Sequence, residues 1–233
     1  MIGDKGSKIK MTIIFFSIIL LCCSLNTYQR NGIWKEGITL WSDCVLKSPY
    51  KARLHNNLAL VYGKKERLDE AISECKRALA INPNFADAHN NLGYAYVKKG
   101  RLDEAISQYK KALTIDPNYV KVHHNLGLVY GKKGRLDEAI SEFKKIIAID
   151  PNDPEVHYDQ GLAYGKKGRL DEAISEYKKA LTIDPNFSKI HNNLGVIYYY
   201  QGNYQLAIIH CDKALELGYS VKPEFLELLR PYR

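Results

Sequence analysis

The chain has 233 residues, of which 45% are hydrophobic and 26% charged, a composition typical of a folded protein. Its formal net charge is +8, but its lysines alternate with acids, which argues against a nucleic-acid-binding surface. The five cysteines show no CxxC spacing, so a small disulfide-stapled fold is not expected.

Residues 1–27 are predicted to form a segment that enters a membrane. Residues 11–25 (MTIIFFSIILLCCSL) carry no charge, and three lysines precede them. About fifteen apolar residues are typical of a signal peptide, whereas a spanning helix takes about 20, a length that residues 9–27 approach. We favour an uncleaved single-pass anchor because no A-x-A cleavage pattern follows; a cleaved signal, a lipid-modified cysteine and a buried helix are the alternatives. The lysines favour a cytoplasmic start, which places the rest of the chain on the extracytoplasmic side.

Residues 28–51 predict the second helix of a partial repeat. They match the first full repeat at an offset of 34 residues, the period described next. Four positions show the match, each 34 residues before its equivalent: Gly37 and Ala71, Trp41 and Cys75, Cys44 and Ala78, and Pro49 and Pro83. If the end of the apolar segment supplies the first helix of this partial repeat, the array is joined almost directly to the membrane.

Residues 52–221 divide into five repeats of the same length: 52–85, 86–119, 120–153, 154–187 and 188–221. The sequence GRLDEAISQYKKALTIDPN at 100–118 recurs at 168–186 with a single change, Gln108 to Glu176. Self-similarity at a fixed period predicts stacked helical hairpins, because a single hairpin cannot bury its apolar face.

Each repeat predicts two helices joined by a short turn. The first helix carries N-L-G-x-x-Y, and the second carries D-E-A-I-x-x-x-K-K-A-L with acids in its first turn, which suits the helix dipole. We expect Gly134 and its equivalents to end the first helix. We expect Asp116, Asp150 and Asp184, each followed by proline, to cap the next helix. The glycines Gly93, Gly127, Gly161 and Gly195 are expected to face the recurring alanines Ala71, Ala105, Ala139, Ala173 and Ala207.

Residues 222–233 predict a capping helix at the end of the array. Pro223 suits a first helical position, and Phe225, Leu226, Leu228 and Leu229 supply an apolar face. We expect this helix to cover the last repeat and to form the natural carboxyl end.

The pattern of residues 52–221 resembles the tetratricopeptide repeat family. The motif L-G-x-x-Y, the aromatic at Tyr109, Phe143 and Tyr177, two alanines and the closing proline all fall in phase. Departures lie mostly in the terminal repeats, at Ala59, Cys75, Cys211 and Tyr219. The resemblance implies an all-α fold, a right-handed superhelical solenoid, here preceded by the apolar amino-terminal helix.

The first helices of such arrays line an inner groove, so we expect a binding face there. Asp87, Asn91, Tyr94 and Lys98 share one helix face by their spacing. The period extends this face into two rows: Asn57, Asn91, Asn125, Asp159 and Asn193, and Lys64, Lys98, Lys132 and Lys166. The asparagine row resembles the ladder of O-linked N-acetylglucosamine transferases, which implies recognition of a peptide backbone by amides. Alternatively, the asparagines tie adjacent helices together and the lysines form a solvated face.

No catalytic or metal-binding pattern stands apart from the repeat. His55, His89, His123, His157 and His191 recur once per period, but equivalent helices lie about 8–10 Å apart, too far to share a zinc ion. We therefore interpret these histidines as packing residues. The Gly-Lys-Lys-Gly turns lack the P-loop spacing. We predict no enzyme activity, no cofactor and no small-molecule substrate.

The sequence thus predicts a membrane-anchored scaffold that binds a protein or an extended peptide. A second hypothesis comes from the run RNGIWKEGITLWSDCVLKSP, residues 30–49, which resembles the junction of membrane glycosyltransferases that carry tetratricopeptide repeats. That resemblance implies a non-catalytic part of, or an accessory to, such an enzyme.

Overall fold

The computed structural model describes residues 37–233, in which all regular structure is helical. The all-α prediction is confirmed for this part of the chain. The predicted membrane or signal segment, residues 1–27, and the apolar helix expected there lie outside the described residues. Among the helices that are described, none is both long enough and apolar enough to cross a bilayer.

The described chain forms two compact units, residues 37–95 and 96–233. The first unit contains α2 (Gly37–Lys47), α3 (Ala52–Lys64), α4 (Leu68–Ile81) and most of α5 (Ala86–Lys98). The second begins with the end of α5 and continues through α6 (Leu102–Ile115), α7 (Val120–Lys132), α8 (Leu136–Ile149), α9 (Pro154–Lys166), α10 (Leu170–Ile183), α11 (Ser188–Tyr200) and α12 (Tyr204–Glu216). The chain then ends in α13 (Pro223–Leu229) and the 3-10 helix η1 (Arg230–Tyr232).

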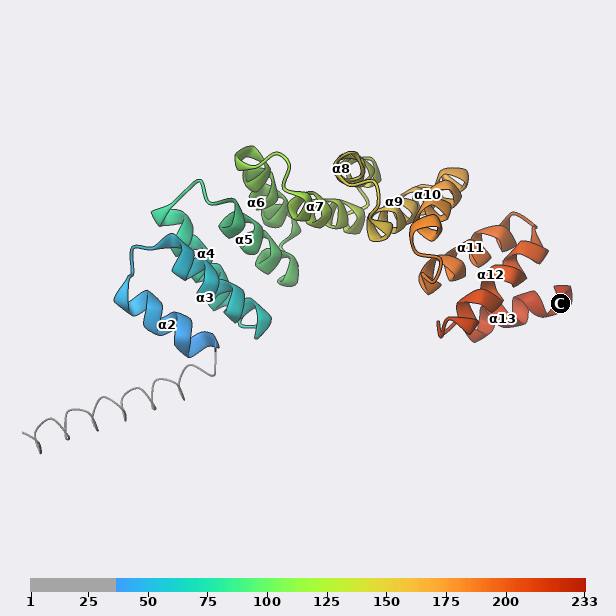
Figure 1. Ribbon diagram of the computed structural model, residues 1–233, viewed down its shortest axis with the longest axis horizontal. Coiled ribbons are helices and arrows are strands. Elements are labelled where there is room, and N and C mark those ends of the chain that lie inside the picture. Colours follow the sequence, from blue (N-terminus) through green and yellow to red (C-terminus); the bar gives the residue numbers. More distant parts are fainter. Residues whose placement is uncertain (1–36) are drawn as a thin grey trace, which may run out of the picture. The chain divides into compact units, whose positions relative to one another are not determined.

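The helices pack as consecutive hairpins (Figure 1). The two helices of one hairpin lie against each other in the pairs α3–α4, α7–α8, α9–α10 and α11–α12. Neighbouring hairpins of the second unit meet through α6–α7, α8–α9 and α10–α11, and in the first unit α2 packs on α3. In the second unit, α7, α9 and α11 therefore each lie between two second helices and keep one face for solvent.

Glycine ends the first helix of the later hairpins, as predicted. Gly134 takes a φ of +74°, and the following N–H of Arg135 donates to the carbonyl of Tyr130 at 2.9 Å. This six-residue closure satisfies a carbonyl at the helix end, and the positive φ favours glycine. In the first hairpin Glu66 occupies the same position with a φ of +57°.

The Asp-Pro-Asn segments do not cap the following helix, so that prediction is wrong. Asp116 instead follows the end of α6, and its carboxylate accepts the N–H of Asn118 at 3.1 Å. The same bond forms at Asp150 and Asp184. In such a turn the aspartate carboxylate accepts the backbone N–H two residues later. It stabilises the connection between the helices and is not available to cap the next helix. Asp153, three residues after Asp150, caps α9 by accepting the N–H groups of Glu155 and Val156.

Two of the helical glycines face aromatic rings rather than alanines. A Cβ placed on Gly127 would lie 2.7 Å from the ring of Phe143, and one on Gly161 would lie 2.5 Å from the ring of Tyr177. Gly195 faces the carbonyl of Ala207 and the backbone of Cys211. The expected glycine–alanine contact is thus wrong for Gly127 and Gly161, because the large ring of the second helix fills the space that glycine leaves.

Candidate functional site

The predicted rows lie on the solvent-facing side of the first helices. Residues of the asparagine row are half-buried, whereas those of the lysine row are exposed. Tyr94 is 45% exposed. The second unit presents this face on three complete hairpins, α7–α8, α9–α10 and α11–α12.

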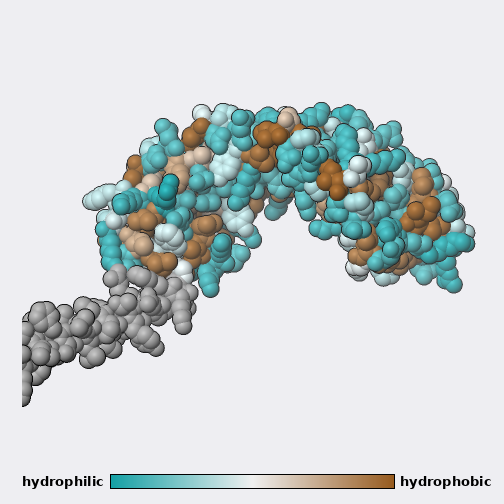
Figure 2. Space-filling view, in the orientation of Figure 1, coloured by the Kyte–Doolittle hydropathy of each residue, from teal (hydrophilic) through white to brown (hydrophobic). Residues whose placement is uncertain are grey.

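An apolar row runs between the two polar rows. Of its members, only Tyr94 was predicted from the sequence as a site residue. In the second unit this row consists of Leu128, which is 44% exposed, and the half-buried Leu162 and Val196. In the first unit it contains Leu60, also 44% exposed. Exposed apolar residues elsewhere on the described surface form separate patches within a hydrophilic background (Figure 2). A row of apolar side chains bordered by polar ones is typical of a binding surface.

Asn91 and Asn193 of this row form hydrogen bonds inside the protein. Asn91 donates through Nδ2 to Oδ1 of Asn56 at 2.9 Å, which joins α5 to α3. Asn193 donates to the hydroxyl of Tyr177 at 3.3 Å, which joins α11 to α10. These amides therefore tie neighbouring helices together. Their role in holding a ligand stays a prediction.

Asp159 interrupts the row of asparagines, and a histidine compensates its charge. Its Oδ2 lies 2.8 Å from Nε2 of His124, which is one period after Asn90. The hydrogen bond to Asp159 raises the pKa of His124 above its usual range, although partial burial opposes the shift. Protonated His124 and ionised Asp159 thus form an ion pair between α7 and α9.

The two lysines of each turn have different surroundings. Lys133 pairs with Asp103 and Lys167 pairs with Asp137, which joins each turn to the preceding repeat. Within residues 37–233, Lys132 and Lys166 form no ion pair. The positive charge of the predicted lysine row therefore remains available to a ligand at these two positions.

A pocket of about 190 Å³ between α7 and α9 brings three predicted site residues together. Asp159, Lys132 and Lys166 line it. Its other lining residues are Gly127, Leu128, Gly131, Leu136, Phe143, Leu162 and Ala163. Asn125 and Asn193 do not line it. The apolar row and the unpaired lysines thus meet in one depression.

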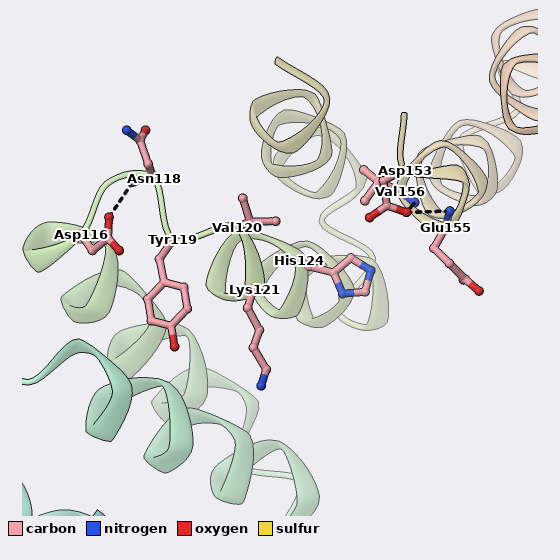
Figure 3. A pocket seen from close by; sticks show the side chains of 9 residues that line it. All are labelled: Asp116, Asn118, Tyr119, Val120, Lys121, His124, Asp153, Glu155 and Val156. Atoms are coloured by element: carbon pink, nitrogen blue, oxygen red, sulfur yellow. Dashed lines mark hydrogen bonds between the residues drawn. The ribbon is translucent and has the colours of Figure 1, made fainter. Parts of the chain in front are cut away.

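A second, more open depression of about 510 Å³ lies at the amino-terminal ends of α7 and α9 (Figure 3). His124 projects from α7 toward the first turn of α9, where Asp153 and Glu155 contribute to its raised pKa. The carboxylates of Asp116 and Asp153 accept backbone N–H groups here, so both have structural partners.

The histidine row is buried, as a packing role requires, and it also has polar partners. His55, His123 and His157 place Nδ1 within 2.5–2.7 Å of Glu74, Glu142 and Glu176, each nineteen residues later. Their Nε2 atoms lie 2.8–3.1 Å from the carbonyls of Pro49, Pro117 and Pro151. In the last hairpin His210 replaces the glutamate, with its Nδ1 at 3.0 Å from that of His191. Among the described residues, no three metal-ligating side chains gather in one place.

These glutamates were not predicted from the sequence, although their spacing carries a signal. Glu74, Glu142 and Glu176 occur at the same period as the histidines, with Gln108 and His210 at the two remaining positions. Two periodic polar residues in an otherwise apolar pattern indicate a repeated buried pair.

Comparison with known proteins identifies the repeats. A family described as TPR repeat matches residues 64–100, 93–134, 132–168 and 161–202, and one described as tetratricopeptide repeat matches residues 188–217. These matches cover more than half of the chain. A search of curated proteins gave no match.

Several solved structures share the fold. The crystal structure of MamA is 28% identical with a TM-score of 0.65, over 67% of this chain and 92% of that chain. MamA from Desulfovibrio magneticus RS-1 is 25% identical with a TM-score of 0.68, over 72% and 94% of the two chains. YrrB, described as a TPR protein with an unusual peptide-binding site, is 24% identical with a TM-score of 0.67, over 82% and 97%. The repeat motif, the hairpins and these matches agree: the chain belongs to the tetratricopeptide repeat family.

Proposed function

We propose that this protein is a scaffold that binds an extended peptide, or an extended segment of a partner protein, along the exposed face of its first helices. One observation carries the proposal. Leu128 and Leu162 are accessible to solvent in the same depression as Lys132 and Lys166, which form no ion pair within residues 37–233. Folding alone does not require apolar side chains and unpaired cations to meet at a surface.

The face offers three kinds of contact to an extended chain. The apolar row can cover side chains of the ligand, and the lysines can pair with its carboxylates. The half-buried amides can take part as well: Oδ1 of Asn193 accepts a hydrogen bond from Asn192 at 3.3 Å, and its second lone pair can accept a backbone N–H of the ligand. Because the helices that carry this face are already folded, ordering them adds no cost when a ligand binds.

We further propose that the scaffold is attached to a membrane through its amino-terminal segment, with the repeats on the extracytoplasmic side. The uncharged residues 11–25 and the lysines before them support this. Extraction of cell membranes with alkaline carbonate tests the attachment: an anchored chain stays in the pellet. Release of the full-length chain into the supernatant would show that it is not anchored.

The sequence of residues 30–49 also supports a second candidate, an accessory or non-catalytic part of a membrane glycosyltransferase. An adjoining coding region for several membrane helices, in frame or split, would favour it. Genes without such a region upstream would favour the independent scaffold.

Site-specific crosslinking tests the binding face. A photoreactive amino acid replaces Leu128 on α7 in one variant and Ile149 on α8 in a control; these residues are 44% and 47% exposed. We expect discrete crosslinked products in cells from position 128, and their loss when Leu162→Glu is added. Equal products from both positions, or none from position 128, would contradict the proposed face.

A further inference from the structure

We infer that the pocket between α7 and α9 takes one large apolar side chain of the ligand, and that this side chain has an acidic neighbour. The inference rests on the proposed function and deepens it. It concerns only the pocket lined by Gly131, Leu128, Leu162, Phe143, Lys132 and Lys166.

The pocket exists because Gly131 has no side chain. A Cβ added to Gly131 would meet nothing within 4 Å, so no neighbour has moved in to fill the space. Gly131 lies within α7 and does not have a positive φ, so its conformation does not require glycine. Glycine inside a helix costs about 0.5–1 kcal/mol relative to alanine. The same position holds Val97 and Tyr199 in other repeats.

The walls of the pocket are apolar and its size suits one side chain. The buried ring of Phe143 and the half-buried Leu136 and Leu162 enclose it together with Leu128. Its volume is about 190 Å³. An apolar cavity of about 150 Å³ holds a benzene ring. A leucine, methionine or phenylalanine side chain of a bound peptide therefore fits.

The charges around the pocket select the neighbour of that side chain. Lys132 and Lys166 line it, and within the described chain neither has an acidic partner. The remaining charged lining residue, Asp159, is 2.8 Å from Nε2 of His124, which offsets its charge. The ligand thus meets a net positive charge, which favours an aspartate or glutamate beside the apolar residue.

Selection from a library of random dodecapeptides displayed on phage tests this inference with the full chain. We expect enriched peptides to share a leucine, methionine or phenylalanine next to an acidic residue. Gly131→Val fills the pocket with the side chain that the second repeat carries at Val97. This variant should weaken the affinity of a selected peptide about tenfold or more, because losing one apolar contact has an effect of that size. Lys132→Gln combined with Lys166→Gln should remove the preference for acids and keep the apolar residue.

A matched control is available in the first repeat. Gly63 is also helical, stands at the same repeat position, and has nothing within 4 Å of an added Cβ. Gly63→Val should leave the affinity of the selected peptide within about twofold. An unchanged denaturation midpoint for Gly131→Val shows that its fold is intact.

The outcomes separate the two levels of the proposal. Enriched peptides that bind Gly131→Val as tightly as the native chain would overturn the pocket and leave the binding face standing. A library that yields no enriched peptide, together with crosslinking that fails at position 128, would overturn the proposed function itself.

Discussion

Nδ1 of His123 lies 2.5 Å from Oε2 of Glu142, and both side chains are buried. Nε2 of His123 lies 2.8 Å from the carbonyl of Pro117, which can only accept a hydrogen bond, so this nitrogen carries a proton. Nδ1 makes the second hydrogen bond of the ring, to the carboxylate of Glu142. One histidine thus joins the preceding turn, α7 and α8, and the same arrangement occurs at His55 and His157.

Removing the carboxylate of this pair should destabilise the hairpin. Glu142→Leu leaves the buried Nδ1 of His123 without its partner, and breaking a buried pair in this way costs about 3 kcal/mol. Urea denaturation followed by circular dichroism measures the loss. Glu142→Gln places there the residue that the second repeat has at Gln108, and it should cost less. Equal stability of Glu142→Leu and the native chain would contradict a stabilising pair.

The last hairpin should lose stability in mild acid. Burial, His191 and Lys178 lower the pKa of His210 to about 4, and Tyr198 stacks on its ring at 5.5 Å. The unfolded chain takes up this proton near pH 6.5, before the folded chain does, so the free energy of unfolding falls as the pH falls from about 6.5 to 4. His210→Glu introduces the carboxylate that three other repeats carry at this position and should flatten this part of the profile. Parallel profiles for the two proteins would show that His210 does not cause the loss.

The pair of His124 with Asp159 should have the opposite dependence on pH. The pKa of His124 is raised, so the stabilisation is present below about pH 6.5 and is lost as the pH rises through the raised value. Asp159→Asn should lower the pKa of His124 in an NMR titration of its imidazole. Glu155→Gln removes a weaker contribution and should lower it less. A larger change with Glu155→Gln would contradict the hydrogen bond as the main cause.

Gln160→Leu should stabilise the protein. Gln160 is 2% exposed, and its Nε2 has no hydrogen-bond partner. It replaces the leucine that the other repeats carry at this position: Leu58, Leu92, Leu126 and Leu194. Because an unsatisfied buried amide costs about 1–3 kcal/mol, we expect a gain of roughly 1–2 kcal/mol in chemical denaturation. The reciprocal variant, Leu126→Gln, should destabilise by a similar amount, and a loss in Gln160→Leu would refute the argument.

Gly127→Ala should destabilise the second unit because its Cβ would lie 2.7 Å from the ring of Phe143. Overpacking of this kind costs about 1–3 kcal/mol. Adding Phe143→Leu shortens the opposing side chain and should recover part of the loss, so the two changes are not additive. Additive losses in thermal denaturation would show that the ring is not what opposes the new methyl group.

The hairpins could be predicted from the sequence because the same motif recurs at a fixed offset. Each turn glycine, such as Gly134, stands where a helix must end. The acids that follow, such as Asp137 and Glu138, indicate the first turn of the second helix. The contacts across a hairpin were harder to predict. Gly127 could have faced either Ala139 or Phe143, and only the relative rotation of α7 and α8 decides between them.

The candidate site was predicted in outline, and its centre was not. One pocket is lined by Lys132, Lys166 and Asp159, which the period of the sequence places in two rows on one face. Gly131 was assigned to the turn because it begins the sequence Gly-Lys-Lys-Gly, yet it lies within α7. Lys133 pairs with Asp103 of the preceding repeat, whereas Lys132 forms no ion pair within the described chain. Because this ion pair links two repeats, the spacing inside one repeat does not predict it.

The ion pairs of Lys133 with Asp103 and of Lys167 with Asp137 have a consequence for how such an array changes over time. Each joins two successive repeats at a separation of thirty residues. An in-frame duplication of one whole repeat brings one lysine and one aspartate with it, and each finds a partner on the adjoining copy. The gene can therefore gain or lose whole repeats without inventing a new interface, which leaves the length of the array free to follow the size of what it holds.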